Sequence, residues 1–461
     1  MKQTTCASTT RTRRALTTVA AAVGIGLLAA ACTSSGSHSS SGTTTPGSGG
    51  GANGSNKCSN GPATGSPLTI AATIINISGG SLSNATVGVP SAQEQENDWT
   101  LVANSVNSQG GAGCHKLVMK YYDVNPIDAS AAQQVCLNIA SDHPFMVLDS
   151  GALTEIGASA CIPAHQIPLA SAYLTGDELK KYSPYYLQIG DIPEDGIRNG
   201  VLGLNQLGYF TAAKGFSKLG VVHHDCTPSL YAAQQAALKE AGVPQSQIVT
   251  YNLGCPAGQN DTPAAMEQAV LNFKNAHVTN VTEVDLTDFA LFTQVAAQQN
   301  YKPIYVLSDT AFAAALKQTG TGAVNPANAD GAVDVVGGAY GESTTPNFQP
   351  TAGTKKCNDI FTTAGQPDVY AQEDGYGGVA CNYLWFVQSL VNHAPSATAA
   401  SLVPAMHTMG TPESSYVFGP VDFSAAPAGS AHGVGYWRPV YYHASCKCFQ
   451  VPDPTWHQPF P

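Results

Sequence analysis

Short apolar segments alternate along most of the chain with longer segments rich in alanine and glutamine. The apolar segments are rich in Val, Ile and Leu, as the buried strands of parallel sheets are. The longer segments have helical spacing: in residues 91–108, Trp99, Val102 and Val106 recur on one face. This alternation predicts an α/β protein with parallel sheets.

The predicted elements form two successive series. In the first series we expect strands at 68–75, 116–122, 145–148 and 168–170, and helices at 91–108, 129–140 and 154–161. In the second we expect helices at 196–207, 229–241, 262–276 and 291–299, and strands at 218–223, 246–251, 283–286, 304–307 and 333–336. The chain then returns through a long helix at 371–390 and strands at 421–423 and 434–442. The predicted fold is therefore two doubly wound lobes with parallel sheets, joined by a hinge.

The first 32 residues carry the pattern of an export signal. Basic residues precede an apolar run at 19–28, which is too short to span a bilayer because a spanning helix needs about 20 apolar residues. The run ends in Ala29-Ala30-Ala31-Cys32, which resembles the lipobox of bacterial lipoproteins, although Ala29 stands where leucine is usual. We expect removal of residues 1–31 and lipidation of Cys32, with simple secretion as the alternative.

Composition indicates how the folded part is tethered and which partners its charge disfavours. Residues 33–56 are almost entirely Ser, Gly, Thr and Asn, so they predict a tether with a reach of roughly 25–30 Å. The signal removes four basic and no acidic residues, which takes the formal charge from −11 to −15. Such an acidic chain excludes nucleic acid as an expected partner.

Ten cysteines remain after Cys6 leaves with the signal and Cys32 takes the lipid. An even number in an exported chain predicts disulfides. Sequence proximity favours the pairs Cys226/Cys255 and Cys357/Cys381, then Cys58/Cys114 and Cys136/Cys161. For Cys446 and Cys448, either a short-range disulfide or bonds to other partners would fit; a metal site is disfavoured because no nearby cluster completes four ligands.

Several local sequences carry a family resemblance. Residues 99–104 lead to Gly110-Gly111 and a strand that ends in Asp123, followed by a proline and an alanine-rich helix up to Cys136. Residues 419–423 precede a glycine-containing turn and a tyrosine-rich strand. In this order they resemble the type 1 periplasmic binding proteins of the leucine/isoleucine/valine-binding kind, the solute-binding parts of ABC importers. The resemblance covers residues 68–451.

The resemblance implies a division of the chain and a set of partners. We expect a signal peptide at 1–31, a lipidated tether at 32–60, an N-terminal lobe from 61–188 plus 340–418, and a C-terminal lobe from 189–339 plus 419–461. It also implies a small-molecule solute, an ABC permease and a membrane reached through the lipid, with no cofactor, no metal and no catalysis by this subunit.

The resemblance also implies which residues line the cleft between the lobes. Ser150 and Gly151 match the loop that holds a ligand carboxylate, and Ala172 and Tyr173 match the segment that offers backbone groups. In the second lobe the candidates are Asp225, Asp288, Phe289 and Asp309, the last standing where amino-acid binders carry a glutamate. This set favours an amino acid, an amide or a related metabolite. Ser150 and Asp309 could instead cap the helices after them.

Other readings of the sequence are less favoured. His223 and His224 are adjacent in a predicted strand and point to opposite faces, so they do not predict a shared metal ion. Residues 375–380 match a dinucleotide-binding motif by letters, but they do not follow a strand. Enzyme motifs such as G-x-S-x-G and H-E-x-x-H are absent. A ligand-sensing receptor of the same fold and, less favoured, a secreted α/β hydrolase using Ser150 remain as alternatives.

Overall fold

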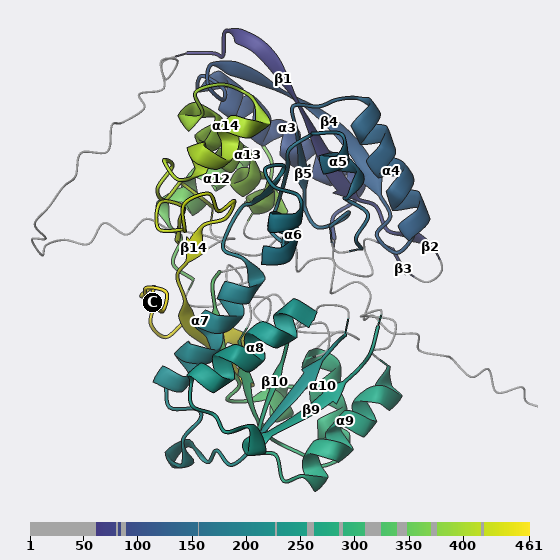
Figure 1. Cartoon of the computed structure of the whole chain (residues 1–461), viewed down its shortest axis with the longest axis vertical. Coiled ribbons are helices and arrows are strands. Elements are labelled where there is room, and N and C mark those ends of the chain that lie inside the picture. Colours follow the sequence, from purple (N-terminus) through teal and green to yellow (C-terminus); the bar gives the residue numbers. More distant parts are fainter. Residues whose placement is uncertain are drawn as a thin grey trace, which may run out of the picture.

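The computed structural model contains two separate parallel-stranded sheets, each covered by helices (Figure 1). The residues it describes are 61–79, 82–83, 89–154, 156–225, 228–255, 262–284, 289–308, 324–338, 348–369, 376–415 and 419–461. Cys32 and the predicted signal and tether lie outside them. The predicted fold class, doubly wound with parallel sheets, is confirmed.

The first sheet has five strands, all parallel, in the order β4-β1-β5-β6-β7. The strands are β1 (Gly65–Ile75), β4 (His115–Val124), β5 (Met146–Asp149), β6 (Leu169–Ser171) and β7 (Tyr186–Gln188). β5 and β6 are buried over their whole length, because helices cover both faces of the sheet. This burial explains why they appear in the sequence as continuous apolar runs.

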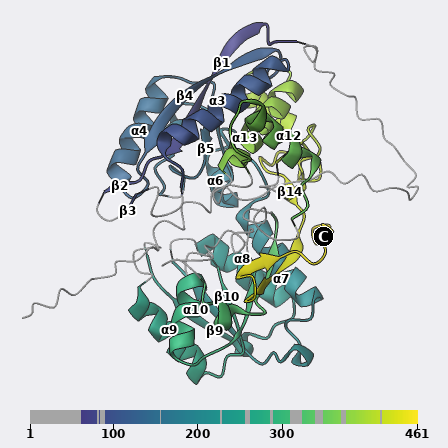
Figure 2. The same cartoon turned by 180° about the vertical axis from the view of Figure 1, so that it is seen from behind.

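Helices from two distant parts of the chain cover this sheet, as both views show (Figures 1 and 2). The first group is α3 (Ala92–Ser108), α4 (Ala129–Ser141), α5 (Cys161–Ala164) and α6 (Gly176–Lys181); the second is α12 (Ala352–Thr363), α13 (Tyr376–His393) and α14 (Ala399–Met406). α13 packs against α3, where the Trp99 and Tyr383 rings meet edge to face with centroids 5.6 Å apart. The returning chain thus completes the core of the first sheet.

The second sheet has seven strands in the order β16-β15-β12-β11-β10-β8-β9. The strands are β8 (Leu219–His223), β9 (Ile248–Asn252), β10 (Asn280–Glu283), β11 (Ile304–Leu307), β12 (Val333–Val336), β15 (Arg438–His443) and β16 (Cys448–Gln450). The helices around it are α7 (Pro193–Gln206), α8 (Pro228–Glu240), α9 (Pro263–Asn275), α10 (Phe289–Gln298) and α11 (Pro326–Ala329). β15 and β16 add antiparallel to an otherwise parallel sheet.

Backbone hydrogen bonds join the segments that run between the two sheets. Gly433 donates to the Gly190 carbonyl at 2.9 Å, and Gly419 donates to the Gly337 carbonyl at 2.7 Å. A short hairpin of β13 (Val421–Asp422) and β14 (Val434–Gly435) lies in the last of these segments. A second short hairpin follows β1, formed by β2 (Ser78–Gly79) and β3 (Leu82–Ser83). The lobe boundaries expected from the resemblance stay a prediction.

Some predicted elements differ from the observed ones. In place of the helix expected at 154–161, the described residues 154 and 156–160 form no regular helix, and the single-turn helix α5 begins at Cys161. Gly157 takes a left-handed conformation with φ of 68°, which does not continue a helix. The strand expected at 283–286 is β10, displaced toward the N-terminus. The elements that the sequence did not predict are α6, α11, α12, α14, β2, β3, β7 and β16.

Three disulfides have both cysteines within the described residues: Cys136–Cys161, Cys357–Cys381 and Cys446–Cys448. They confirm two predicted pairs and the short-range alternative for the third. Cys114 and Cys255 are also disulfide-bonded. Their predicted partners, Cys58 and Cys226, lie outside the described residues.

Candidate ligand-binding site

Strand order identifies a candidate site at the carboxyl end of each sheet. In each, the first strand has the second on one side and the third on the other: β4-β1-β5 in the first and β9-β8-β10 in the second. In doubly wound folds, ligands bind at the carboxyl ends of the strands where the order reverses in this way. The predicted residues Ser150 and Asp225 follow β5 and β8, and so lie at these two points.

Asp149, the last residue of β5, organises the first-lobe site. Its side chain is fully buried and accepts a hydrogen bond from the Thr73 hydroxyl at 2.8 Å and from the Thr154 hydroxyl at 2.8 Å. It also accepts from the backbone amides of Leu153 at 3.1 Å and Thr154 at 3.0 Å. Burial raises the pKa of Asp149, while these hydrogen bonds oppose the rise. The carboxylate therefore holds the turn at 150–154 against the end of β1.

Ser150 sits inside this turn, next to the returning helix α13. Its amide donates to the Thr73 hydroxyl at 3.3 Å, and its own hydroxyl accepts from the Tyr376 hydroxyl at 3.3 Å. Ser150 is only 1% exposed, so Tyr376 covers the hydroxyl predicted to meet the ligand. Gly151 has a φ of 102°, a conformation that favours glycine and gives the turn its shape.

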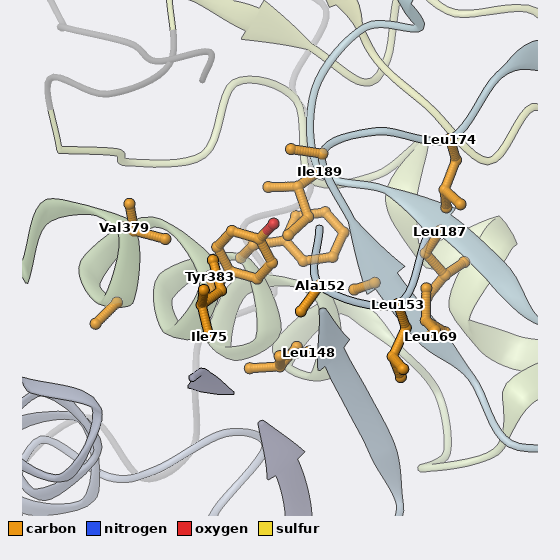
Figure 3. Close-up of a cluster of buried hydrophobic side chains, with 14 of the residues drawn as sticks. Ile75, Leu148, Ala152, Leu153, Leu169, Leu174, Leu187, Ile189, Val379 and Tyr383 are labelled. Carbon is orange, nitrogen blue, oxygen red and sulfur yellow. The ribbon is translucent and has the colours of Figure 1, made fainter. Parts of the chain in front are cut away.

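Apolar side chains pack against the turn at 150–154. Figure 3 shows Ala152 and Leu153 of the turn in one buried cluster with Leu148 of β5 and Tyr383 of α13. The Tyr383 hydroxyl donates to the Asp149 carbonyl at 3.0 Å. Burial raises the pKa of both Tyr376 and Tyr383, so at neutral pH both are uncharged and can donate hydrogen bonds.

The other predicted first-lobe residues follow β6. The Ala172 carbonyl accepts from the Gln188 side-chain amide at 2.6 Å, and the Tyr173 amide donates to the Ser171 hydroxyl at 3.3 Å. The Ser171 hydroxyl lies 3.3 Å from that of Thr154, which links this segment to the Asp149 network. The structure thus brings Ser150, Gly151, Ala172 and Tyr173 to adjacent strand ends.

The second-lobe residues are more dispersed. Asp225 is exposed and accepts from the Asn252 side-chain amide at 2.6 Å. Phe289 is fully buried and packs edge to face on Tyr305, with ring centroids 5.1 Å apart, so it belongs to the core of its lobe in this conformation. Asp288 and Asp309 lie outside the described residues.

Buried polar residues near the carboxyl ends of strands were not predicted as part of the candidate site, either in the first sheet or in the second. Asp149 ends β5, and Thr73 lies near the end of β1. Both are buried polar residues within apolar runs, and that interruption is the signal that could have revealed them. His223, at the end of β8, stacks on Tyr231 with ring centroids 3.9 Å apart, and burial lowers its pKa. Glu283, which is buried at the end of β10, lies beside Val222 in the parallel register.

The described residues offer neither a metal-binding cluster nor a membrane-spanning helix. No group of three or more His, Cys, Asp or Glu side chains is placed to hold a metal ion in this part of the chain. Likewise, no helix within the described ranges combines the length and apolar character needed to cross a membrane.

Comparison by sequence finds no matching family model and no matching curated protein. Comparison by structure finds many solute-binding proteins. A possible leucine/isoleucine/valine-binding protein from Rhodopirellula baltica has a TM-score of 0.57 and 13% identity, covering 85% of this chain and 98% of its own. An ABC transporter substrate-binding protein from Desulfitobacterium hafniense, in complex with Leu, has a TM-score of 0.56 and 13% identity, covering 84% and 100%.

A third structure binds a different kind of molecule. It is the solute-binding protein of an ABC transporter from Rhodopseudomonas palustris BisB5, in complex with 3,4-dihydroxybenzoic acid. Its TM-score is 0.56 at 13% identity, over 86% of this chain and 98% of its own. The chain therefore has the type 1 periplasmic binding protein fold, as the sequence resemblance predicted. At these identities the likeness concerns the fold alone.

Proposed function

We propose that this chain is an extracytoplasmic solute-binding lipoprotein that captures a small polar metabolite and delivers it to an ABC importer. The observation that carries the proposal is the polar network at the carboxyl ends of β1, β5 and β6, where Thr73, Asp149 and Ser150 meet. In this fold such a position is where ligands bind. The subunit acts by binding and conformational change and breaks no bond.

The proposed ligand contact in the first lobe is the Ser150 hydroxyl, which suits a carboxylate or amide oxygen. The backbone amides of Ser150, Leu153 and Thr154 already donate within the turn and to Thr73. The Ser150 oxygen accepts from the Tyr376 hydroxyl at 3.3 Å, so the Ser150 hydroxyl hydrogen is the group that would donate to a ligand oxygen. Binding would then add a ligand contact to the residue that Tyr376 holds, which links occupancy to the position of α13.

The class of ligand follows from the same site. Asp309 and Asp225 are the second-lobe candidates for an ammonium or another donor group, which favours amino acids and amides. The solved structures of this fold include complexes with Leu and with 3,4-dihydroxybenzoic acid. Both ligands carry a carboxylate, so we propose that the end held by Ser150 is anionic or carbonyl-like.

Thermal-shift measurements on the soluble part, residues 57–461, test this proposal. The panel is leucine, glutamine, 3,4-dihydroxybenzoate and maltose, each in excess. We expect at least one of the first three to raise the melting temperature, because a ligand that binds only the folded form stabilises it. Ser150→Ala should reduce that rise, whereas the exposed change Asp177→Asn should not. A rise with maltose alone would contradict the proposed ligand class.

The proposed anchor at Cys32 has its own test. Cells expressing the full chain and fed a labelled fatty acid should incorporate the label into the wild-type protein and not into Cys32→Ala. The wild-type protein should sediment with membranes, because a lipid adds roughly 0.8 kcal/mol of binding energy for each buried methylene. Equal labelling of Cys6→Ala and wild type is the matched control. Unlabelled wild-type protein in the medium would instead indicate simple secretion.

A further inference from the structure

The chain ends beside α7 and β14, next to the segments that connect the two sheets, in both views (Figures 1 and 2). We call residues 453–461, which form this end, the strap. The strap pairs with the chain just before β15. The Trp437 amide donates to the His457 carbonyl at 3.1 Å, and the His457 amide donates to the Trp437 carbonyl at 2.8 Å. Two backbone hydrogen bonds therefore fix the position of the strap.

The Trp437 ring attaches the strap to α7. The ring is 2% exposed and stacks on the rings of His457 and Phe460, whose centroids lie 4.4 Å and 5.4 Å away. Its Nε1 donates to the Gln458 carbonyl at 3.0 Å. The same ring lies so close to α7 that a Cβ at Gly203 would be 3.1 Å from it. The ring thus contacts both the strap and α7, and aromatic pairs of this kind stabilise a contact beyond the area that they bury.

Hydrogen bonds also join the strap to α7 directly. The Phe460 amide donates to the Asn199 side-chain oxygen at 3.2 Å, and the Arg198 guanidinium donates to the Phe460 carbonyl at 2.9 Å. The Asn199 side-chain nitrogen donates in turn to the Gly435 carbonyl of β14 at 3.4 Å. α7 begins at Pro193, shortly after the chain leaves the first sheet at the end of β7. Through α7, the strap is therefore tied to the first of the connecting segments.

Trp456 extends the strap to the other two connecting segments. Gly337 follows β12, and Gly419 lies between α14 and β13. A Cβ at Gly419 would lie 2.8 Å from the Trp456 ring and 2.0 Å from the Gly337 carbonyl oxygen, so the ring and both segments are in close contact there. The Arg438 guanidinium lies over the Trp456 ring, 4.2 Å from its centroid, and is attracted to the ring face. All three connecting segments therefore meet the strap, directly or through one neighbour.

We propose that the strap limits how far the two lobes open, by holding the three connecting segments together. Lobe opening is a hinge motion, in which a few residues of the connecting segments absorb large changes in φ and ψ. Such changes move α7, Gly337 and Gly419 relative to one another, and contacts that bridge them through the strap are lost as they separate. A strap that only completed the core of the second lobe would stabilise folding without changing the separation of the lobes. The proposal goes beyond the proposed function, because it concerns the protein without solute.

Double electron–electron resonance of the soluble part, with one spin label on each lobe, tests the proposal. The labels are attached at Asn104→Cys in α3 and Gln268→Cys in α9, both of which replace exposed residues. The double substitution Trp456→Ser with Phe460→Ser removes the strap's ring contacts to Gly419 and to Trp437. Without added solute, we expect this strap variant to show a mean distance between the labels that is several ångströms longer, and a broader distribution of distances, than the protein with an intact strap.

The controls separate control of opening from simple stabilisation. Pro454→Ser, an exposed change within the strap, should leave the distances as they are. If circular dichroism shows that the strap variant does not fold, Trp456→Ala, which keeps the stack on Trp437, should lengthen the mean distance to a smaller extent. A folded variant whose distances match those of the intact protein would overturn the proposal even if it melts at a lower temperature, as would equal lengthening in Pro454→Ser. Because no solute is added, failure of the solute panel to bind would leave this result standing.

Discussion

Replacement of Asp149 by alanine is expected to lower the free energy of unfolding by about 3 kcal/mol or more and to abolish ligand binding. The substitution removes the acceptor for two hydroxyls and two backbone amides. All four donors are buried, so water cannot replace the carboxylate without opening the turn. Since that turn carries Ser150, its disorder removes the first-lobe site.

Asp149→Asn separates the contribution of charge from that of shape. Asparagine keeps one acceptor oxygen but turns an NH₂ group toward donors, so we expect a loss of about 1–2 kcal/mol. Urea unfolding of the three proteins, followed by tryptophan fluorescence, gives the comparison. If Asp149→Ala and wild type unfold at the same urea concentration, Asp149 does not organise the turn as described.

The second large effect concerns pH and the connection between the sheets. Burial raises the pKa of Asp191 from 3.8 to about 7, with nearby Asp195 adding to the rise. The unfolded chain therefore loses this proton at a lower pH than the folded protein does. Stability should fall as pH rises from about 4 to about 7, by up to about 1.4 kcal/mol for each pH unit. Asp191→Asn should remove this slope, making the variant more stable than wild type above pH 7.

Melting temperatures measured between pH 4 and pH 8 provide the test, with Asp177→Asn as the control that removes an exposed carboxylate. The asparagine side chain fits the same space, in which the Asp191 carboxylate lies against Gly435. Gly435→Ala should destabilise the protein at every pH, because its Cβ would lie 2.4 Å from an Asp191 oxygen. An unchanged pH slope in Asp191→Asn would show that another group is responsible.

Much of the fold could be predicted because buried parallel strands are apolar along their whole length. β5 and β11 were found on this basis at nearly their observed bounds. β7 was not predicted because it has three residues and ends in the polar Gln188. The Gln188 side chain is buried and donates hydrogen bonds to the carbonyls of Ala172 and Asp191. A pattern of apolar residues does not reveal a buried glutamine whose polar groups are satisfied by hydrogen bonds.

The candidate site was less predictable than the fold. Ser150 could be placed after β5 from the resemblance, but its partner Tyr376 lies 226 positions later in the chain. That contact depends on how α13 returns to the first sheet, which no local pattern encodes. Phe289 illustrates the opposite case: it was expected near a ligand, and the position of α10 turns its ring into the core against Tyr305.

Small-angle X-ray scattering of the soluble part, with and without the panel compound that most raises its melting temperature, tests the central claim most directly. If the two lobes close on a solute held at Ser150, the radius of gyration should fall when the compound is added to wild type. It should stay unchanged for Ser150→Ala at the same concentration. An equal fall in both proteins, or no fall in wild type despite measurable binding, would contradict capture of the solute at Ser150 by lobe closure.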